Sequence, residues 1–122
     1  MAWGWSTCVD CAGCDPETIN DTTVMRDFIE AMLLGLDMVP IGDPQFIWCE
    51  TNDPNKVGWT GFQILQDSNI TFHLCSKTNE AYCDVFSCKP YEQAVVIELI
   101  KEYFRPKAVR AQFIDRTAPS LA

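Results

Sequence analysis

Apolar residues recur at three- and four-residue steps in two stretches of the chain, and each stretch predicts an amphipathic helix. Asp21 and Thr22 can cap the first helix, whose apolar positions are Met25, Phe28, Ile29, Met32, Leu33 and Leu36. Pro90 opens the second helix, predicted over residues 91–104, with an apolar face of Val96, Leu99, Ile100, Tyr103 and Phe104. Because each helix has a single apolar face, each must pack against another layer of structure.

β-Branched and aromatic residues without helical spacing predict six extended segments. These segments cover residues 3–11, 45–50, 60–65, 70–75, 81–87 and 109–114. A tight turn of sequence KTNE, residues 77–80, makes the clearest hairpin in the chain. The turn formers Asp67, Ser68 and Asn69 predict a break in the ladder at Ser68, with strained backbone.

Six strands and two one-sided helices predict an α+β fold: a two-layer sandwich of a mainly antiparallel sheet with both helices on one face. The chain of 122 residues is long enough for one core and has no internal repeat, so residues 1–122 are expected to form a single domain. A domain of this size leaves a sheet face that can take a partner, and we expect a homodimer. That second face supplies the dimer interface or the active-site surface.

The charge of the chain excludes more functions than it identifies. Nine basic and seventeen acidic residues give a formal net charge of −8 without a basic cluster, so nucleic acid is a poor partner. The longest apolar stretch, residues 28–39, is interrupted by Glu30 and Asp37 and is too short to cross a membrane. The N-terminus does not look like an export signal, and an odd number of cysteines, seven, favours reduced thiols in the cytoplasm.

His73 is the only histidine, and the pairing expected in the hairpin places a hydroxyl and a thiol near it. If the end residues of the turn 77–80 face each other, paired residue numbers sum to 157, and Cys88 lies opposite Asn69, beside Ser68. A hydroxyl, a thiol and an imidazole then converge. On a regular strand Ser68 and His73 point to opposite faces, and the predicted break at Ser68 weakens that objection.

A serine held in a strained turn can break the peptide bond that precedes it. Its hydroxyl oxygen attacks the preceding carbonyl carbon and forms an ester, which is an N-to-O acyl shift. A base then removes the serine α-proton and the upstream chain leaves as a carboxylic acid. The dehydroalanine that remains hydrolyses to a pyruvoyl group. Ser68 is the candidate, because a serine supplies both the nucleophile and the carbon skeleton.

The residues around Ser68 resemble a known family. QDSNITFH and YCDVFSC are similar to the pattern of the prokaryotic S-adenosylmethionine decarboxylases, in which an acidic residue precedes a self-cleaving serine. In that family a histidine follows the serine by five residues and a cysteine follows the histidine by fifteen, spacings that Asp67, Ser68, His73 and Cys88 reproduce. Upstream, AGCD is similar to the end of the family's first strand, and Thr60 stands where the family has a processing serine.

The resemblance covers nearly the whole chain and implies a pyruvoyl-dependent decarboxylase of polyamine (spermidine) biosynthesis, made as a zymogen. It implies autocatalytic cleavage between residues 67 and 68, with Ser68 converted to the pyruvoyl cofactor and with His73 and the hydroxyl of Thr60 assisting the processing. Cys88 is then the acid that protonates the substrate carbon after carbon dioxide leaves. The ketone forms a Schiff base with the α-amine of the substrate and acts as an electron sink.

One departure from the family pattern concerns the substrate. Four residues after the processing histidine the family has a glutamate that holds the ribose hydroxyls, and here that position is Lys77. Loss of a charged hydrogen bond, about 1.5 to 3 kcal/mol, weakens nucleoside binding roughly ten- to a hundredfold unless another carboxylate, such as Glu80, replaces it. S-adenosylmethionine is the expected substrate, and the alternative is ornithine or arginine, which relatives on this fold decarboxylate.

Two further alternatives remain open from the sequence. Cys8, Cys11 and Cys14 have the spacing of a metal-binding run. On an extended segment, however, Cys11 faces away from the other two, so three buried, small apolar side chains are the simpler interpretation. The other alternative is an uncleaved, non-catalytic relative that serves as a binding or activating subunit, although such a subunit has no need of the intact motif residues.

Overall fold

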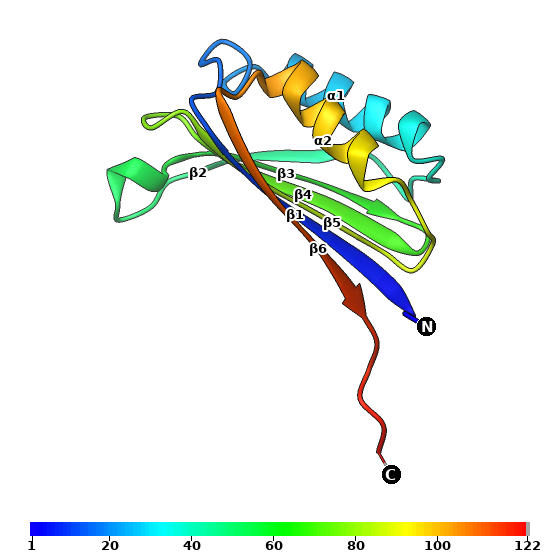
Figure 1. Cartoon of the computed structure of the whole chain (residues 1–122). Coiled ribbons are helices and arrows are strands. Elements are labelled where there is room, and N and C mark those ends of the chain that lie inside the picture. Colours follow the sequence, from blue (N-terminus) through cyan, green and yellow to red (C-terminus); the bar gives the residue numbers. More distant parts are fainter. Residues whose placement is uncertain (122) are drawn as a thin grey trace.

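The computed structural model describes residues 1–121 and shows a six-stranded sheet with two helices on one face (Figure 1). The strands are β1 Gly4–Ala12, β2 Gln45–Cys49, β3 Gly58–Leu65, β4 Ser68–Cys75, β5 Glu80–Ser87 and β6 Ala108–Arg116. The helices are α1 Thr22–Gly35, α2 Gln93–Phe104 and a short 3₁₀ helix, η1 Pro54–Lys56. The strand order is β2-β3-β4-β5-β1-β6 with antiparallel neighbours, which confirms the predicted α+β sandwich.

The first helix begins where the sequence predicts and the second begins later. Asp21 caps α1, because its side chain accepts a hydrogen bond from the backbone N–H of Thr23 at 2.8 Å. α2 begins at Gln93, whereas the pattern predicts residue 91 as its start. The side chain of Tyr91 lies 2.7 Å from the hydroxyl of Thr7 on β1, so Tyr91 anchors the loop before the helix to the sheet.

The core lies between the sheet and the two helices. Phe28 of α1, Phe72 of β4 and Phe104 of α2 are fully buried, and their ring centroids lie 4.8 to 5.8 Å apart. Gly61 of β3 makes room for this aromatic cluster, because a Cβ atom there would lie 2.3 Å from the ring of Phe72. The other fully buried members of the core include Val9, Ile19, Met25, Ile29, Met32, Ile70, Leu74, Val96 and Ile100.

The β4–β5 hairpin differs in register from the prediction. Cys75 pairs with Glu80, so the paired residue numbers sum to 155 instead of 157. Four unpaired residues, 76–79, connect the strands, whereas the predicted pairing of Lys77 with Glu80 leaves only two, and Asn79 ends the turn with a left-handed φ of 58°. A shift of two residues leaves every side chain on its predicted face, because side chains alternate along a strand.

Ser68 does not break the sheet, contrary to the prediction. It is the first residue of β4 and pairs with Leu65 of β3 and with Ser87 of β5. The turn before it consists of Gln66 and Asp67, and neither Asp67 nor Ser68 has a positive φ. Left-handed backbone therefore contributes no strain at this peptide bond, and the groups around it are the available source of reactivity.

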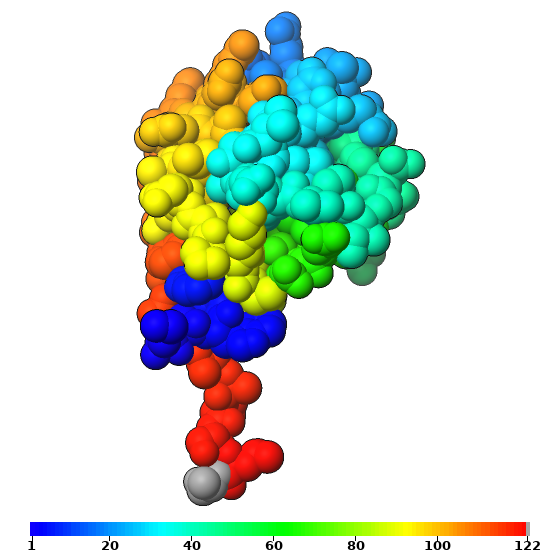
Figure 2. Space-filling model, turned by 90° about the vertical axis from the view of Figure 1, so that its right-hand side faces the viewer, coloured from blue at the N-terminus to red at the C-terminus, as the bar shows by residue number. Residues whose placement is uncertain are grey.

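The face of the sheet away from the helices is open (Figure 1). A row of cross-strand neighbours, Ile47, Thr60, His73 and Tyr82, lies on this open face, and Ile47 and Tyr82 are exposed. After Arg116 the chain leaves the sheet as a tail that projects from one end of the molecule (Figure 2). Across residues 1–121, none of the helices combines the length and the apolar character that a membrane span requires.

Candidate active site

Ser68 lies at the end of the sheet where the β3–β4 turn meets the last residues of β5 (Figure 1). Its hydroxyl donates a 2.6 Å hydrogen bond to the hydroxyl oxygen of Ser87, its cross-strand partner. Ser87 is fully buried, and its hydroxyl donates to the carbonyl oxygen of Lys89 and accepts from the N–H of Lys89, each at 2.9 Å. The hydroxyl of Ser68 is therefore held by a group that is itself fixed to the backbone.

The carbonyl oxygen of Asp67, in the peptide bond to Ser68, accepts two hydrogen bonds from Cys88. The backbone N–H of Cys88 lies 3.1 Å from this oxygen and the thiol sulfur lies 3.3 Å from it. Two donors on one carbonyl oxygen draw electron density from the carbon and stabilise negative charge on the oxygen. A nucleophile that attacks this carbon would thus form its oxyanion where donors already stand.

The structure places Cys88 beside Ser68 by a different register from the predicted one. The β4–β5 pairing, continued past Ser87, brings Cys88 next to Asp67 and not opposite Asn69. The prediction that Cys88 lies beside Ser68 is still correct, because the register error is two residues and side chains on a strand repeat every two residues. A hydroxyl and a thiol consequently border the same peptide bond.

Thr60 and His73 form a second group of predicted site residues. They are cross-strand neighbours on β3 and β4, and Oγ1 of Thr60 lies 2.7 Å from Nδ1 of His73. Nε2 of His73 lies 2.7 Å from the carbonyl oxygen of Lys56. Because a carbonyl oxygen only accepts, a neutral His73 carries its proton on Nε2, and Nδ1 accepts from the hydroxyl of Thr60. Sequence reasoning missed Cys49, whose thiol donates to Oγ1 of Thr60 at 3.4 Å.

The two groups do not meet within one chain. Side chains alternate along β4, so Ser68 shares the helix side of the sheet with the buried Ile70 and Phe72, whereas His73 lies on the open face. Five residues of extended chain also separate Ser68 from His73 by roughly 16 Å along the strand. The predicted convergence is therefore right for the hydroxyl and the thiol and wrong for the imidazole.

A small cavity of about 70 Å³ adjoins the bond between Asp67 and Ser68. Lys89 lines it, and the ammonium group of Lys89 binds the carboxylate of Asp37 at 3.2 Å and also its carbonyl oxygen. A space of this size admits water and excludes an amino acid. Sequence reasoning missed Lys89, for which the one available signal was its place directly after Cys88.

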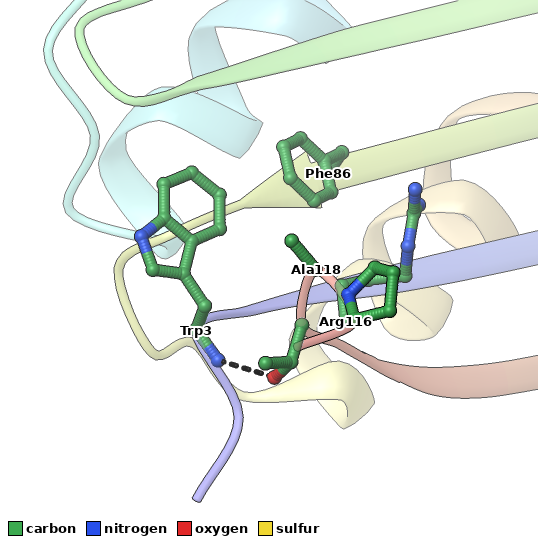
Figure 3. A pocket seen from close by; sticks show the side chains of 6 residues that line it. Trp3, Phe86, Arg116 and Ala118 are labelled. Carbon is green, nitrogen blue, oxygen red and sulfur yellow. Dashed lines mark hydrogen bonds between the residues drawn. The ribbon is translucent and has the colours of Figure 1, made fainter. Parts of the chain in front are cut away.

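A larger cavity, of about 580 Å³, lies near the same end of the sheet (Figure 3). Trp3, Phe86 and Arg116 line it together with the tail that follows β6. The rings of Trp3 and Phe86 stack with their centroids 6.1 Å apart, and the guanidinium of Arg116 lies 5.1 Å from the centroid of Phe86. Phe86 alternates along β5 with the buried Val85 and Ser87, so the cavity lies on the open face of the sheet, whereas the side chain of Ser68 lies on the helix side. The volume and aromatic walls of the cavity suit a small molecule with a planar part.

Cys11 and Cys14 lie side by side, which corrects the prediction that Cys11 faces away. The strand β1 ends at Ala12, and Gly13 turns the chain with a φ of 66°, so Cys14 returns to the side of Cys11. A hydrogen bond between the two thiols, together with burial, raises the pKa of Cys11. Within residues 1–121, no group of three or more His, Cys, Asp or Glu side chains is arranged to hold a metal ion.

Comparison with known proteins relates this chain to one family. The family model described as S-adenosylmethionine decarboxylase matches residues 5–117, a range that includes both groups of site residues. The chain is 28% identical to the S-adenosylmethionine decarboxylase proenzyme of Pyrococcus furiosus over 115 residues, which cover 93% of this chain and 78% of the relative. It is 30% identical over 115 residues to the proenzyme of the same name from Thermococcus gammatolerans, covering 93% of this chain and 76% of that one.

A solved structure has the same fold. The crystal structure of the adenosylmethionine decarboxylase from Aquifex aeolicus superimposes with a TM-score of 0.80. The superposition covers 99% of this chain and 96% of the other, with 20% sequence identity. At that identity the likeness establishes the arrangement of strands and helices, and the chemistry has to be argued from the residues.

Proposed function

The chain belongs to the S-adenosylmethionine decarboxylase family, and on that basis we propose that it cleaves itself and decarboxylates S-adenosylmethionine with a pyruvoyl group derived from Ser68. The product, decarboxylated S-adenosylmethionine, feeds spermidine biosynthesis. One observation carries the proposal: Cys88 donates two hydrogen bonds to the carbonyl oxygen of Asp67, next to the hydroxyl of Ser68. The single domain of residues 1–122 would mature into residues 1–67 and 68–122.

The first step exchanges a peptide bond for an ester. Oγ of Ser68 attacks the carbonyl carbon of Asp67, the C–N bond between the two residues breaks, and the hydroxyl proton ends on the nitrogen of Ser68, which becomes an amine. The N–H and thiol of Cys88 hold the oxygen that turns negative while the carbon is tetrahedral. Removal of one such donor from an enzyme costs about 10²- to 10³-fold in rate, so this pair is a substantial part of the expected acceleration.

The second step needs a base that removes the α-proton of Ser68. Residues 1–67 then leave as a carboxylate, and the dehydroalanine left at position 68 takes up water and releases ammonia. His73 is the proposed base, since it is the only histidine and its Nδ1 has the lone pair that a base requires. Its distance from Ser68 of the same chain means that a second copy must supply it.

We infer a homodimer in which the open faces of two sheets meet. The open face exposes Ile47, Tyr82 and Ile114, apolar side chains that a partner would cover. It also presents Thr60 and His73, which would then face the backbone of Ser68 in the other subunit, the part of that residue that carries the α-proton. The proposed dimer thereby completes a site that one chain leaves divided.

The residues around Ser68 fit the pyruvoyl group. Ser68 provides its carbon skeleton and is held between two strands, and Cys88 stays beside it. When formed, the group supplies a ketone carbonyl that withdraws electrons from the α-carbon of the substrate. The thiol of Cys88 is half-buried and is the proposed acid that returns a proton to that carbon after carbon dioxide leaves.

The cavity lined by Trp3, Phe86 and Arg116 is the proposed place for the substrate. Its aromatic faces suit a purine, and the guanidinium suits a carboxylate. Lys77 stands in an exposed turn where the family has a ribose-binding glutamate, so another carboxylate must serve the ribose. Glu80, whose Oε1 accepts from the hydroxyl of Thr78 at 2.9 Å, is the nearest candidate along the chain. Glu80 begins β5 and Phe86 lies near its end, so Glu80 would serve this cavity from the second copy of the proposed dimer, as His73 would.

The proposed location is the cytoplasm. All seven cysteines are free thiols in the described part of the chain, which supports a reducing compartment. The partners that follow from the proposal are a small-molecule substrate and a second copy of the chain, without nucleic acid or membrane.

Mass spectrometry of the purified protein tests the proposal. It should detect two fragments, residues 1–67 and a second fragment from position 68 that begins with a ketone. Ser68→Ala should remain one chain and release no carbon dioxide. Release of carbon dioxide from S-adenosylmethionine, ornithine and arginine, assayed in parallel, identifies the substrate. Wild-type protein that keeps an unmodified Ser68 and still releases carbon dioxide would refute the proposal.

A further inference from the structure

We propose that Ser87 is a positioning residue for self-cleavage, which aims the oxygen of Ser68 at the carbonyl carbon of Asp67; the inference rests on the function proposed above. Neither the family motif nor the chemistry of the site singles out Ser87. The hydrogen bonds around it do, because they fix the direction of the proton on Ser68.

A serine hydroxyl has one proton to donate and two lone pairs to accept with. The proton of Ser87 goes to the carbonyl oxygen of Lys89 at 2.9 Å, and the N–H of Lys89 takes one lone pair at 2.9 Å. One lone pair remains, and the hydroxyl of Ser68 lies 2.6 Å from it. Ser68 must therefore donate, which leaves both of its own lone pairs free for attack.

Ser87 can hold this direction because it is buried and its hydroxyl makes three hydrogen bonds. It is fully buried on the helix side of β5, and it pairs with Ser68 on one side and Trp5 on the other. The loop that contains Lys89 is tied down in turn, since the ammonium of Lys89 binds Asp37 after α1. A serine hydroxyl at the start of a strand otherwise samples three rotamers, so Ser87 selects one of them.

Ser87 does not act as the base. A hydroxyl and a peptide carbonyl are both too weakly basic to keep a proton at neutral pH. In the acyl shift the proton of Ser68 instead passes to the peptide nitrogen as the C–N bond breaks and the C–O bond forms, so no further reactant is needed. Ser87 instead holds the hydroxyl of Ser68 in one orientation, which lowers the entropy cost of reaching the reactive geometry.

The test compares variants of Ser87 in the full chain. Ser87→Ala should slow cleavage about tenfold, the effect of one hydrogen bond. Ser87→Thr keeps the hydroxyl and should restore the wild-type rate. Ser87→Cys fills the same space, but its sulfur accepts hydrogen bonds poorly, so this variant should cleave as slowly as Ser87→Ala. It therefore tests the lost hydrogen bond even if Ser87→Ala folds badly. Ser76→Ala is the matched control, because it removes another 2.6 Å side-chain hydrogen bond, to Asn20, at a distance from the site.

Time courses with and without hydroxylamine separate orientation from a general loss of structure. Hydroxylamine cleaves esters and leaves peptide bonds, so it reports how much chain has passed the acyl shift. Ser87→Ala should contain little hydroxylamine-sensitive chain, whereas His73→Ala should accumulate it. Cleavage of both Ser87→Ala and Ser87→Cys at or above the wild-type rate overturns the role of Ser87. A wild-type chain that never cleaves instead removes the proposed function, and this inference with it.

Discussion

Ser68 and His73 lie on one strand, five residues apart, and their side chains leave it on opposite faces of the sheet. Rotation of the side chains cannot close a separation of roughly 16 Å along the strand. The nucleophile and the base of self-cleavage consequently come from two copies of the chain if the proposed mechanism holds. Self-cleavage would therefore require the dimer.

Complementation between two inactive variants tests the shared site. Ser68→Ala and His73→Ala should each remain uncleaved when produced alone. Co-produced, they should form mixed dimers in which the His73→Ala chain is cleaved, because its partner supplies an intact imidazole. The measurement is the fraction of cleaved chain by mass spectrometry, with tags that distinguish the two variants. A mixed population that stays uncleaved would contradict a site shared between two chains.

Some parts of the fold and of the site could be predicted from the sequence, and others could not. The cap at Asp21 and the three- and four-residue steps agree, so α1 is predicted nearly to the residue. The β4–β5 register is missed by two residues, because the sequence does not reveal that Asn79 takes a left-handed conformation and lengthens the turn. The contact between Ser68 and Ser87 depends on that register and is missed with it. The opposite faces of Ser68 and His73 follow from their numbers, but the expectation of strain obscured them.

Substitution of Cys88 should separate cleavage from decarboxylation. Cys88→Ala removes the thiol, a weak donor, and keeps the stronger backbone N–H on the carbonyl oxygen of Asp67. Cleavage should therefore slow only about tenfold, less than the loss of a full oxyanion donor costs. Decarboxylation should fall further, by a factor on the order of 10² to 10⁴, because the acid is lost. The measurement is carbon dioxide release per mole of pyruvoyl group. An unchanged rate per pyruvoyl group in Cys88→Ala would assign the acid to another residue.

We predict that the buried thiol of Cys83 makes the protein less stable at alkaline pH. Burial raises the pKa of Cys83 above the ordinary thiol value of 9.0. Above that pH the unfolded chain releases protons that the folded chain keeps. The free energy of unfolding should therefore be level below about pH 8 and fall as the pH rises through 9 and beyond. Urea unfolding across this range measures it, and Cys83→Ala should show a shallower fall. Equal slopes in the two proteins would contradict the assignment.

Gly61 should be required for the aromatic core. In Gly61→Ala the new Cβ would lie 2.3 Å from the ring of Phe72, so the ring or the strand must shift. Overpacking of this kind costs about 1 to 3 kcal/mol of unfolding free energy. The double variant Gly61→Ala with Phe72→Leu should lose less than the sum of the two single variants, because the smaller side chain relieves the clash. Strict additivity in urea unfolding would show that the core accommodates the methyl group elsewhere.

Lys77→Glu tests how this chain binds its substrate. Lys77 lies in the exposed turn between β4 and β5, so the substitution should leave the fold intact. A carboxylate at the family's ribose-binding position should lower the KM for S-adenosylmethionine roughly ten- to a hundredfold, the effect of one charged hydrogen bond. It should not improve the use of ornithine or arginine, which have no ribose. Lys101→Glu is the control, because it makes the same change in net charge on α2, away from the open face. If both variants shift the KM equally, long-range charge is responsible; if neither does, another group such as Glu80 already holds the ribose.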